Sequence, residues 1–507
     1  MKSNKQDLLN TFLSDSLTYQ QKLFASANCA ERYFDPKEVL GYSQLESQYL
    51  SDNILCDLNE GNVPYRPRYI VVDFNVLLEN GCQFLELEKP TNLDELLDSL
   101  LILYKHIPSV TSFPVYIGDL DALINPFLSC DDQSDHIKIK RFLNHIDKTI
   151  PDSFCHANLG PKTNQATKLI LEAVLELNNP TPNLTFIYQK GVSDEDIYTL
   201  AIKAGLLKAK PSFANIEYCR DVLDKYAFVS CYNHLPKQGG AYSLTRIRLG
   251  TLARKFDNQA DFFKELNRVI QANLSLMDKR VDFIVNKSNF FKTSFLLDES
   301  FIKKENFTSM IAIVGLFECV NHLLSANVKA KQFGFNANAD DLAHQILQFI
   351  DKLVSQHYAP LVIDNKYVLH AQVGASLSDE DYFNTPAHRL KVGEEPMLYD
   401  HIKQIAPFHQ YFSSGVGDLF AFDQTYSTKP EALKPIIAAA FKYGMRYISL
   451  YQKDSDLIRV TGYLVKKSEV AKFESGQVVL RDTEIFGSGT NKCANVFKRE
   501  VKTSDHQ

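Results

Sequence analysis

The sequence lacks the features of a membrane-bound or secreted protein. None of its apolar runs approaches the roughly 20 residues that a membrane-spanning helix needs. The polar N-terminal stretch 1–7 has no apolar segment of the kind found in signal peptides. The nine cysteines include no CxxC pair, and the histidines show no metal-ligand spacing, so we predict neither a disulfide framework nor a metal site. We therefore expect a cytoplasmic protein with reduced thiols.

The chain also has no excess of charge of one sign. Its net charge is −6, with acidic and basic residues interspersed, which gives no electrostatic footprint for a nucleic acid polymer. Hydrophobic residues make up 45% of the chain, enough for a large core. A homodimer is compatible with the sequence but is not specified by it.

Helical and strand patterns alternate along the chain. Helical patterns cover residues 6–60, which we expect to be all helical, and then Leu93–His106, Ser193–Ala209 with Ser193 as N-cap, Met310–Leu324 and Ala432–Tyr443. Strand patterns cover Tyr69–Asp73, Asn183–Tyr188, Tyr226–Ser230 and Ala241–Ile247, the last two on either side of a polar loop, Asn233–Gly240. The alternation predicts an α/β fold with a largely parallel sheet. Periodicity does not distinguish a barrel from a doubly wound sheet.

The most informative stretch is Arg459-Val-Thr-Gly462-Tyr463, within a run of strand-forming residues. A glycine α-carbon can become planar and hold an unpaired electron that is delocalised between the adjacent amide groups, because no side chain interferes. Glycine also allows tight turns and close backbone approach. On these residues alone, a strand with one glycine bulge is an equally good interpretation.

A second feature is Cys231, which follows the strand pattern ending at Ser230 and precedes Gly239-Gly240. A loop held between two strands can project one side chain into a barrel interior. A thiol suits hydrogen-atom transfer because a carbon radical can cleave its S–H bond, and the resulting thiyl can attack a substrate C–H bond. A buried, inert cysteine is the more common alternative.

Several stretches in matching order resemble the glycyl radical enzymes. Upstream of Arg459–Tyr463 they are Asn80–Leu87, Phe113–Phe127, Pro182–Ile187, Lys210–Asn215, Ser230–Ala253 and Ile313–Glu318. Within that superfamily the chain is similar in general to anaerobic (class III) ribonucleotide reductases and most similar to the YjjI-like branch. The resemblance implies an N-terminal helical cap over 1–65, a ten-stranded α/β barrel surrounded by helices over 66–440, and a C-terminal glycyl radical segment over 441–507. It also implies a glycyl radical at Gly462 and a thiyl radical at Cys231.

The resemblance further implies a partner, since a separate radical-SAM activating enzyme would install the radical using S-adenosylmethionine. No bound metal or organic cofactor is implied, and the substrate would be a small molecule converted under anaerobic conditions. Cys82 falls where the reductases carry a redox cysteine and is a candidate second thiol. Cys319 precedes a valine, as in the dehydratase thiyl motif, but its apolar helical surroundings indicate a core residue.

The departures from the reductases concern substrate recognition. Too few residues precede the barrel for a nucleotide-binding cone, and no cysteine lies between Tyr443 and Arg459 to form the reductase zinc site. Arg248 replaces an asparagine, and the reductase Pro-x-Glu-Ser segment is here Pro-Ala-His388-Arg389. His388, Arg389 and Arg248 are therefore candidate substrate-binding residues, with a surface pair as the alternative for the first two. An enzyme that still reduces nucleotides and a non-catalytic, radical-storing or metabolite-binding relative remain alternatives.

Two further sets of residues are ambiguous. Asp119 and Asp121 have the spacing of side chains on one face of a strand and could be polar groups in a pocket, but capping of the next helix is the simpler interpretation. The glycine-containing loop Ser413–Asp418 resembles a phosphate-binding loop, although such loops are frequent and nonspecific.

Overall fold

A computed structural model describes residues 2–31, 39–56, 65–109, 113–150, 152–218, 224–230, 232–371 and 385–503. The described strands form two five-stranded sheets and two separate hairpins. Within the described ranges, no helix is both long enough and apolar enough to cross a membrane.

The first sheet has the strand order β1-β8-β9-β10, with β2 also paired to β8. Its strands are β1 (Leu55–Cys56), β2 (Tyr69–Val71), β8 (Gly239–Arg248), β9 (Phe307–Val314) and β10 (Val368–Ala371). β8, β9 and β10 run parallel, whereas β1 and β2 pair antiparallel with β8. All residues of β8 and β9 are buried, as expected for parallel strands covered on both faces.

The second sheet has the order β11-β12-β5-β4-β3. Its strands are β3 (His156–Leu159), β4 (Asn183–Tyr188), β5 (Ser212–Asn215), β11 (Asp418–Phe422) and β12 (Tyr447–Gln452). β3, β4 and β5 run parallel to one another, and β11 and β12 run parallel to each other. The two groups meet where β12 pairs antiparallel with β5. This sheet therefore combines two parallel groups of opposite direction.

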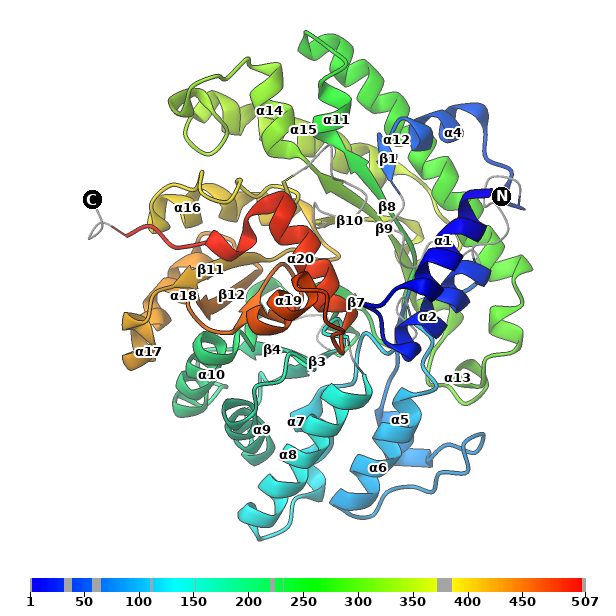
Figure 1. Ribbon diagram of the computed structural model, residues 1–507, viewed down its shortest axis with the longest axis vertical. Coiled ribbons are helices and arrows are strands. Elements are labelled where there is room, and N and C mark those ends of the chain that lie inside the picture. The colour runs from blue at the N-terminus through cyan, green and yellow to red at the C-terminus, as the bar shows by residue number, and fades with distance from the viewer. Residues whose placement is uncertain are drawn as a thin grey trace.

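Helices surround the two sheets, and the strands encircle the middle of the molecule (Figure 1). The N-terminal and first-half helices are α1 (Lys2–Leu13), α2 (Tyr19–Glu31), α4 (Gln44–Ser51), α5 (Asn75–Asn80), α6 (Leu93–Tyr104), α7 (Leu120–Ile124), α8 (Asp132–Thr149), α9 (Gln165–Glu176) and α10 (Glu195–Lys208). The later ones are α11 (Leu249–Ala253), α12 (Gln259–Asp282), α13 (Phe295–Asp298), α14 (Leu316–Leu323), α15 (Ala337–Gln356), α16 (Leu398–Ile405), α17 (Thr425–Thr428), α18 (Lys434–Lys442), α19 (Lys467–Glu474) and α20 (Asp482–Ala494).

Backbone hydrogen bonds extend the two sheets toward each other. The Ala371 amide at the end of β10 donates to Gly415 O at 3.0 Å, shortly before β11, and the Ile117 amide donates to His156 O of β3 at 2.9 Å. The α/β fold is thus as expected, but the described strands form no closed ladder, and the ten-stranded barrel stays a prediction.

The two hairpins contact the sheets. One consists of β6 (Tyr226–Val229) and β7 (Asn233–Pro236), and the other of β13 (Leu457–Arg459) and β14 (Leu464–Lys466). Figure 1 shows β7 in the central region. β6 contacts β3, and β13 contacts β12, so both hairpins lie against the second sheet.

Several predicted elements are confirmed, namely β2, β4, α6 and the helical region that contains α18. The prediction for Met310–Leu324 is wrong, because the stretch is divided between β9 and α14 at Gly315, whose φ is 80°. A buried parallel strand and a buried helix are both continuously apolar, so periodicity could not separate them. The segment 6–60 is not all helical, since β1 pairs with β8.

Three local predictions also need correction. The expected polar loop Asn233–Gly240 contains β7 and the start of β8. The N-cap of α10 is Asp194, whose carboxylate accepts from two backbone amides, rather than Ser193. Asp119 makes no capping hydrogen bond but pairs with Lys237 at 2.6 Å, and Asp121 is buried against Thr167.

Candidate active site

Gly462 lies in the turn of the β13–β14 hairpin. Arg459 pairs with Leu464 across the ladder, and the Val460 amide donates to Tyr463 O at 3.0 Å, which leaves Thr461 and Gly462 at the tip. Gly462 is buried and is not among the described glycines with a positive φ. The turn is therefore not a strand bulge, and its backbone conformation does not by itself require glycine.

Side chains from the second sheet hold this hairpin by its backbone. Asn183 Nδ2 of β4 donates to Gly462 O at 2.8 Å. Arg459 is fully buried, and its Nη2 donates to Asn183 Oδ1 at 2.8 Å and to Ala209 O at 2.7 Å. Ser153 Oγ exchanges hydrogen bonds with the backbone of Leu464. These contacts fix the carbonyl of Gly462 against the start of β4.

Cys231 itself lies outside the described residues, but its neighbours on both sides are described. β6 ends at Val229 and β7 begins at Asn233, and these two residues pair. The Ser230 amide donates to Val115 O at 3.0 Å, and its carbonyl accepts from His156 Nδ1. Ser230 has a positive φ of 53°. The chain that leads into Cys231 is therefore held tightly against β3.

The two hairpin turns are held by adjacent residues of one strand pair. His156 of β3, which binds Ser230 O, is the direct register partner of Asn183 of β4, which binds Gly462 O. Neighbouring strands lie about 4.8 Å apart. The second sheet thus brings the residue before Cys231 and the carbonyl of Gly462 to the same place, although they are far apart in the sequence.

A buried hydrogen-bond chain supports the Ser230 contact. Tyr447 Oη lies 2.6 Å from Thr185 Oγ1, which in turn lies 2.7 Å from His156 Nε2. Because His156 Nδ1 donates to Ser230 O, its Nε2 accepts from Thr185. Burial, with the nearby charge of Arg459, lowers the pKa of His156 to about 3, so the ring is neutral.

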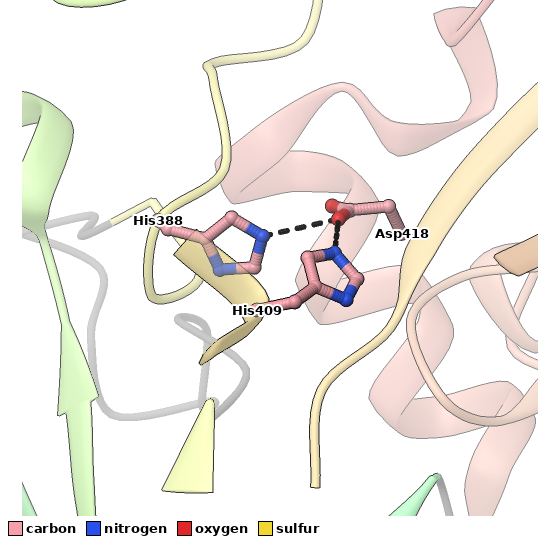
Figure 2. Close-up of side chains that lie close together, drawn as sticks. All are labelled: His388, His409 and Asp418. Atoms are coloured by element: carbon pink, nitrogen blue, oxygen red, sulfur yellow. Dashed lines mark hydrogen bonds and ion pairs between the residues drawn. The ribbon is translucent and has the colours of Figure 1, made fainter. Parts of the chain in front are cut away.

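A second buried cluster contains His388, Arg389, His409 and Asp418. His388 Nε2 and His409 Nε2 approach Asp418 Oδ2 at 3.0 and 2.7 Å, as Figure 2 shows. Arg389 Nε donates to Asp418 Oδ1 at 3.2 Å. Burial alone would raise the pKa of Asp418, but the two histidines hold it well below its usual value. His388 and Arg389 are thus buried, which rules out the alternative of a surface pair.

The geometry of two histidines and one carboxylate also raises the question of a metal. Their ligand atoms lie within 4.8 Å of one another. However, His409 Nδ1 accepts a hydrogen bond from the Arg446 amide at 3.0 Å, so the proton of the neutral ring is on Nε2, facing Asp418. Burial lowers the pKa of His409 to about 4 and keeps the ring neutral. The donor set fits an Asp–His hydrogen-bond network and does not fit a metal bound at His409 Nε2.

Arg389 connects this network with the Cys231 turn. Its Nη2 donates to Tyr232 Oη at 3.1 Å, and its guanidinium lies 5.5 Å from the centre of the Tyr232 ring. Tyr232 in turn packs against Tyr447, with ring centroids 5.8 Å apart. The residues on both sides of Cys231 are therefore fixed, Ser230 by His156 and Tyr232 by Arg389.

The β6–β7 hairpin also borders an open pocket with about 1130 Å³ of space between atoms, part of it open to solvent. Among its lining residues are Tyr226, His234, Thr308, Lys366, Ser414 and Arg446. The loop 413–418 thus contributes to a pocket wall, and Ser414 Oγ donates to Leu369 O at 2.6 Å. Polar and aromatic groups of this kind are typical of a small-molecule site.

Other candidates lie elsewhere in the fold. Cys82 is buried in the main core, and burial raises its pKa to about 11, which opposes the thiolate form. Cys319 is a core residue of α14, as expected. Arg248 ends β8 opposite Val314, which forms an isolated bridge with Pro386. The backbone of Arg248 is therefore close to the segment that carries His388 and Arg389.

Sequence reasoning missed His156, Asn183, His409 and Asp418. Only Asp418 belonged to a candidate site, as the last residue of the Ser413–Asp418 loop, whereas Asn183 lay in the stretch Pro182–Ile187 that carries the resemblance but had no role of its own. The other three gain their roles from contacts with residues distant in sequence, which no local pattern contains.

Comparison with known proteins decides the family. Residues 17–502 match the family model described as glycyl radical enzyme YjjI-like. The chain belongs to this family. It is 54% identical to an uncharacterized protein of Haemophilus influenzae over 99% of this chain and 98% of that protein. It is 36% identical to the uncharacterized protein YjjI of Escherichia coli, over 92% of this chain and 91% of that protein.

Solved structures support this family assignment at the level of the fold. The anaerobic ribonucleotide reductase from Thermotoga maritima, with dATP bound in the specificity site, gives a TM-score of 0.68 at 11% identity, over 90% of this chain and 91% of that chain. A protein from Roseburia inulinivorans, described under 1,2-propanediol dehydration, gives 0.62 at 11% identity, over 96% and 86%. The chain is thus an α/β protein similar to glycyl radical enzyme barrels.

Proposed function

We propose that Gly462 stores an unpaired electron and exchanges it with Cys231, whose thiyl radical attacks a small-molecule substrate under anaerobic conditions. The observation that carries this proposal is the shared anchoring of the two turns. His156 and Asn183 are register partners on β3 and β4, and they bind the carbonyls of Ser230 and Gly462. Gly462 lies at a buried hairpin tip and has no positive φ, so its backbone conformation does not explain why this residue is glycine. A radical at its α-carbon would explain it.

The steps conserve atoms and electrons. A separate radical-SAM activating enzyme, supplied with S-adenosylmethionine and one electron, removes one hydrogen atom from the Gly462 α-carbon while residues 441–507 are displaced. After the segment returns, the α-carbon takes the hydrogen atom of the Cys231 thiol and leaves a thiyl radical. The thiyl takes a hydrogen atom from a substrate C–H bond and later returns one to the product radical. Burial of Gly462 and of Ser230 and Tyr232, the neighbours of Cys231, excludes water and oxidants from these radicals.

Substrate recognition is proposed to centre on the Cys231 turn and the adjoining pocket. Arg389 acts there by holding Tyr232 directly, and His388 acts by holding Asp418, which in turn holds Arg389. Arg248 contributes from the end of β8. The core position and the raised pKa of Cys82 favour a structural role. A role for Cys82 as second thiol is proposed only for the case that the reaction is a redox one.

A test that needs no substrate follows from the proposed exchange. A thiol hydrogen exchanges with solvent, so hydrogen transfer between Gly462 and Cys231 in D₂O should replace the remaining α-hydrogen by deuterium. The glycyl doublet in the electron paramagnetic resonance spectrum should then collapse in the unaltered protein. It should persist in Cys231→Ala, which still forms the radical, and collapse in the matched core control Cys319→Ala.

The outcomes separate the alternatives. A doublet that persists in the unaltered protein would mean that Cys231 does not exchange hydrogen with Gly462, as in a non-catalytic radical store. A doublet that collapses in Cys231→Ala would assign the exchange to another thiol, with Cys82 the next candidate. Reduction of added nucleotides by the activated protein would identify a reductase.

A further inference from the structure

A second pocket lies between the β13–β14 hairpin, the chain after α20 and the segment 385–395. We call the β13–β14 hairpin, which carries Gly462 at its tip, the glycyl radical hairpin. The pocket encloses about 570 Å³ of space between atoms, part of it open to solvent. We call it the C-terminal pocket. The residues on which the argument rests are Arg389, Lys391, Glu395, Asp418, Thr461 and Arg499. One wall thus comes from the segment proposed to leave during activation, and the other from residues that remain.

Each side of this boundary contributes one buried donor without a partner to the lining of the pocket. Arg389 is 9% exposed and Thr461 is 3% exposed. Arg389 Nη1 and Thr461 Oγ1 have no hydrogen-bond partner among the residues that the structure describes. Leaving a buried polar group without a hydrogen-bond partner is unfavourable. A ligand that accepts from both groups would remove this penalty at two positions at once.

The charges of the pocket favour an anion. Arg389, Lys391 and Arg499 supply three cations, against the carboxylates of Asp418 and Glu395. Asp418 is already engaged with Arg389 and two histidines. Arg499 donates hydrogen bonds to three neutral oxygens, those of the Tyr451 hydroxyl and of the Arg459 and Val460 carbonyls. The excess of one positive charge matches a monoanion.

We propose that the C-terminal pocket binds a small carboxylate anion, which accepts hydrogen bonds from Arg389 and Thr461 and fastens the glycyl radical hairpin to the segment 385–395. Thr461 directly precedes Gly462, and Arg499 holds the carbonyls of Arg459 and Val460 in the same hairpin. The anion therefore stabilises the docked hairpin. Under the proposed function, on which this step rests, Gly462 leaves the barrel to be activated. The bound anion therefore slows activation.

Binding is tested on the full-length, unactivated protein with acetate as the probe. Isothermal titration should show saturable acetate binding, at ionic strength held constant with sodium chloride. Hydrogen–deuterium exchange should show slower exchange in residues 457–466 and 482–499. Thr461→Val keeps the shape of the side chain and removes its hydroxyl, and Lys391→Met removes an exposed charge. Each should weaken acetate at least fivefold, whereas the control Thr199→Val on α10 should not.

The results that would overturn the proposal are equally specific. No saturable binding would show that the pocket holds only water or an adventitious ion. Binding of phosphate in preference to acetate would refute a carboxylate as the ligand, and unchanged acetate affinity in Thr461→Val would refute the proposed contact with Thr461. In the activation assay, saturating acetate should slow the appearance of the glycyl radical. Absence of any radical, with acetate binding intact, would count against the proposed function and leave the binding site standing. Radical formation at an unchanged rate despite binding would refute the fastening role.

Discussion

Asn183 is the residue whose replacement tests the docking of the glycyl radical hairpin most sharply. We expect Asn183→Leu, which preserves much of the side-chain volume, to remove the hydrogen bonds to Gly462 O and to Arg459 Nη2. A neutral hydrogen bond contributes about 1 kcal/mol and one to a charged group about 2 kcal/mol, so the docked hairpin should lose about 3 kcal/mol. That corresponds to an undocking equilibrium raised about 100-fold.

The assay is hydrogen exchange at single amides under native conditions. The Val460 amide donates to Tyr463 O, and the Leu464 amide donates to Ser153 Oγ at 3.1 Å. Where exchange proceeds by local opening, its rate follows the opening equilibrium. Both amides should therefore exchange about 100-fold faster in Asn183→Leu, the factor expected from the hydrogen-bond energies.

A matched control separates local from general destabilisation. Asn179 is another buried asparagine, whose Nδ2 donates to Asn144 Oδ1 at 3.2 Å. Asn179→Leu should lower global stability without selectively accelerating Val460 and Leu464. If these two amides exchanged at the same rate in both variants, the reasoning that Asn183 docks the hairpin would be refuted.

Three further results are expected. Because His156 and His409 are buried with pKa values of about 3 and 4, the unfolded state binds more protons below pH 6.5. Each histidine should therefore lower the free energy of unfolding by roughly 2 kcal/mol as the pH falls from 7 to 5, measured in denaturant titrations. A free energy of unfolding that did not change over this pH range would contradict their burial as neutral rings. Asp418→Asn should lower the unfolding free energy by about 3–5 kcal/mol, because it leaves Arg389 buried without its carboxylate, and a loss below 1 kcal/mol would show that the cluster is not coupled. Air admitted to the activated protein should cleave the chain at Gly462, seen by mass spectrometry, and should leave unactivated protein and Gly462→Ala intact.

The sequence predicted the elements that local patterns define and missed those that distant contacts define. Asn183–Tyr188 is a strand in sequence and structure, because six residues that include Thr, Phe, Ile and Tyr are short for a helix and are rich in strand formers. The β7 segment Asn233–Pro236 has a polar, proline-containing sequence typical of a loop, yet it forms a strand. Its partner β6 and the bridge from Asn233 to Gly415 supply contacts that no local pattern encodes.

The candidate site shows the same division. Gly462 and the loop around Cys231 could be singled out because their chemistry requires particular residue types in a recognisable order. His156 and Asn183 could not, since each is an ordinary polar residue at the start of a buried strand. Their function arises only when β3 and β4 pair and two distant hairpins converge on them.

The most direct test of the account is the electron paramagnetic resonance spectrum of the protein, after anaerobic incubation with a cognate activating enzyme, S-adenosylmethionine and a reductant. The account predicts a doublet, from coupling of the unpaired electron to the one remaining α-hydrogen of Gly462. The doublet should collapse when the protein is made with α-deuterated glycine and be absent in Gly462→Ala. No signal from an activating enzyme shown to be competent, or a doublet that survives in Gly462→Ala, would contradict the assignment of the radical to Gly462.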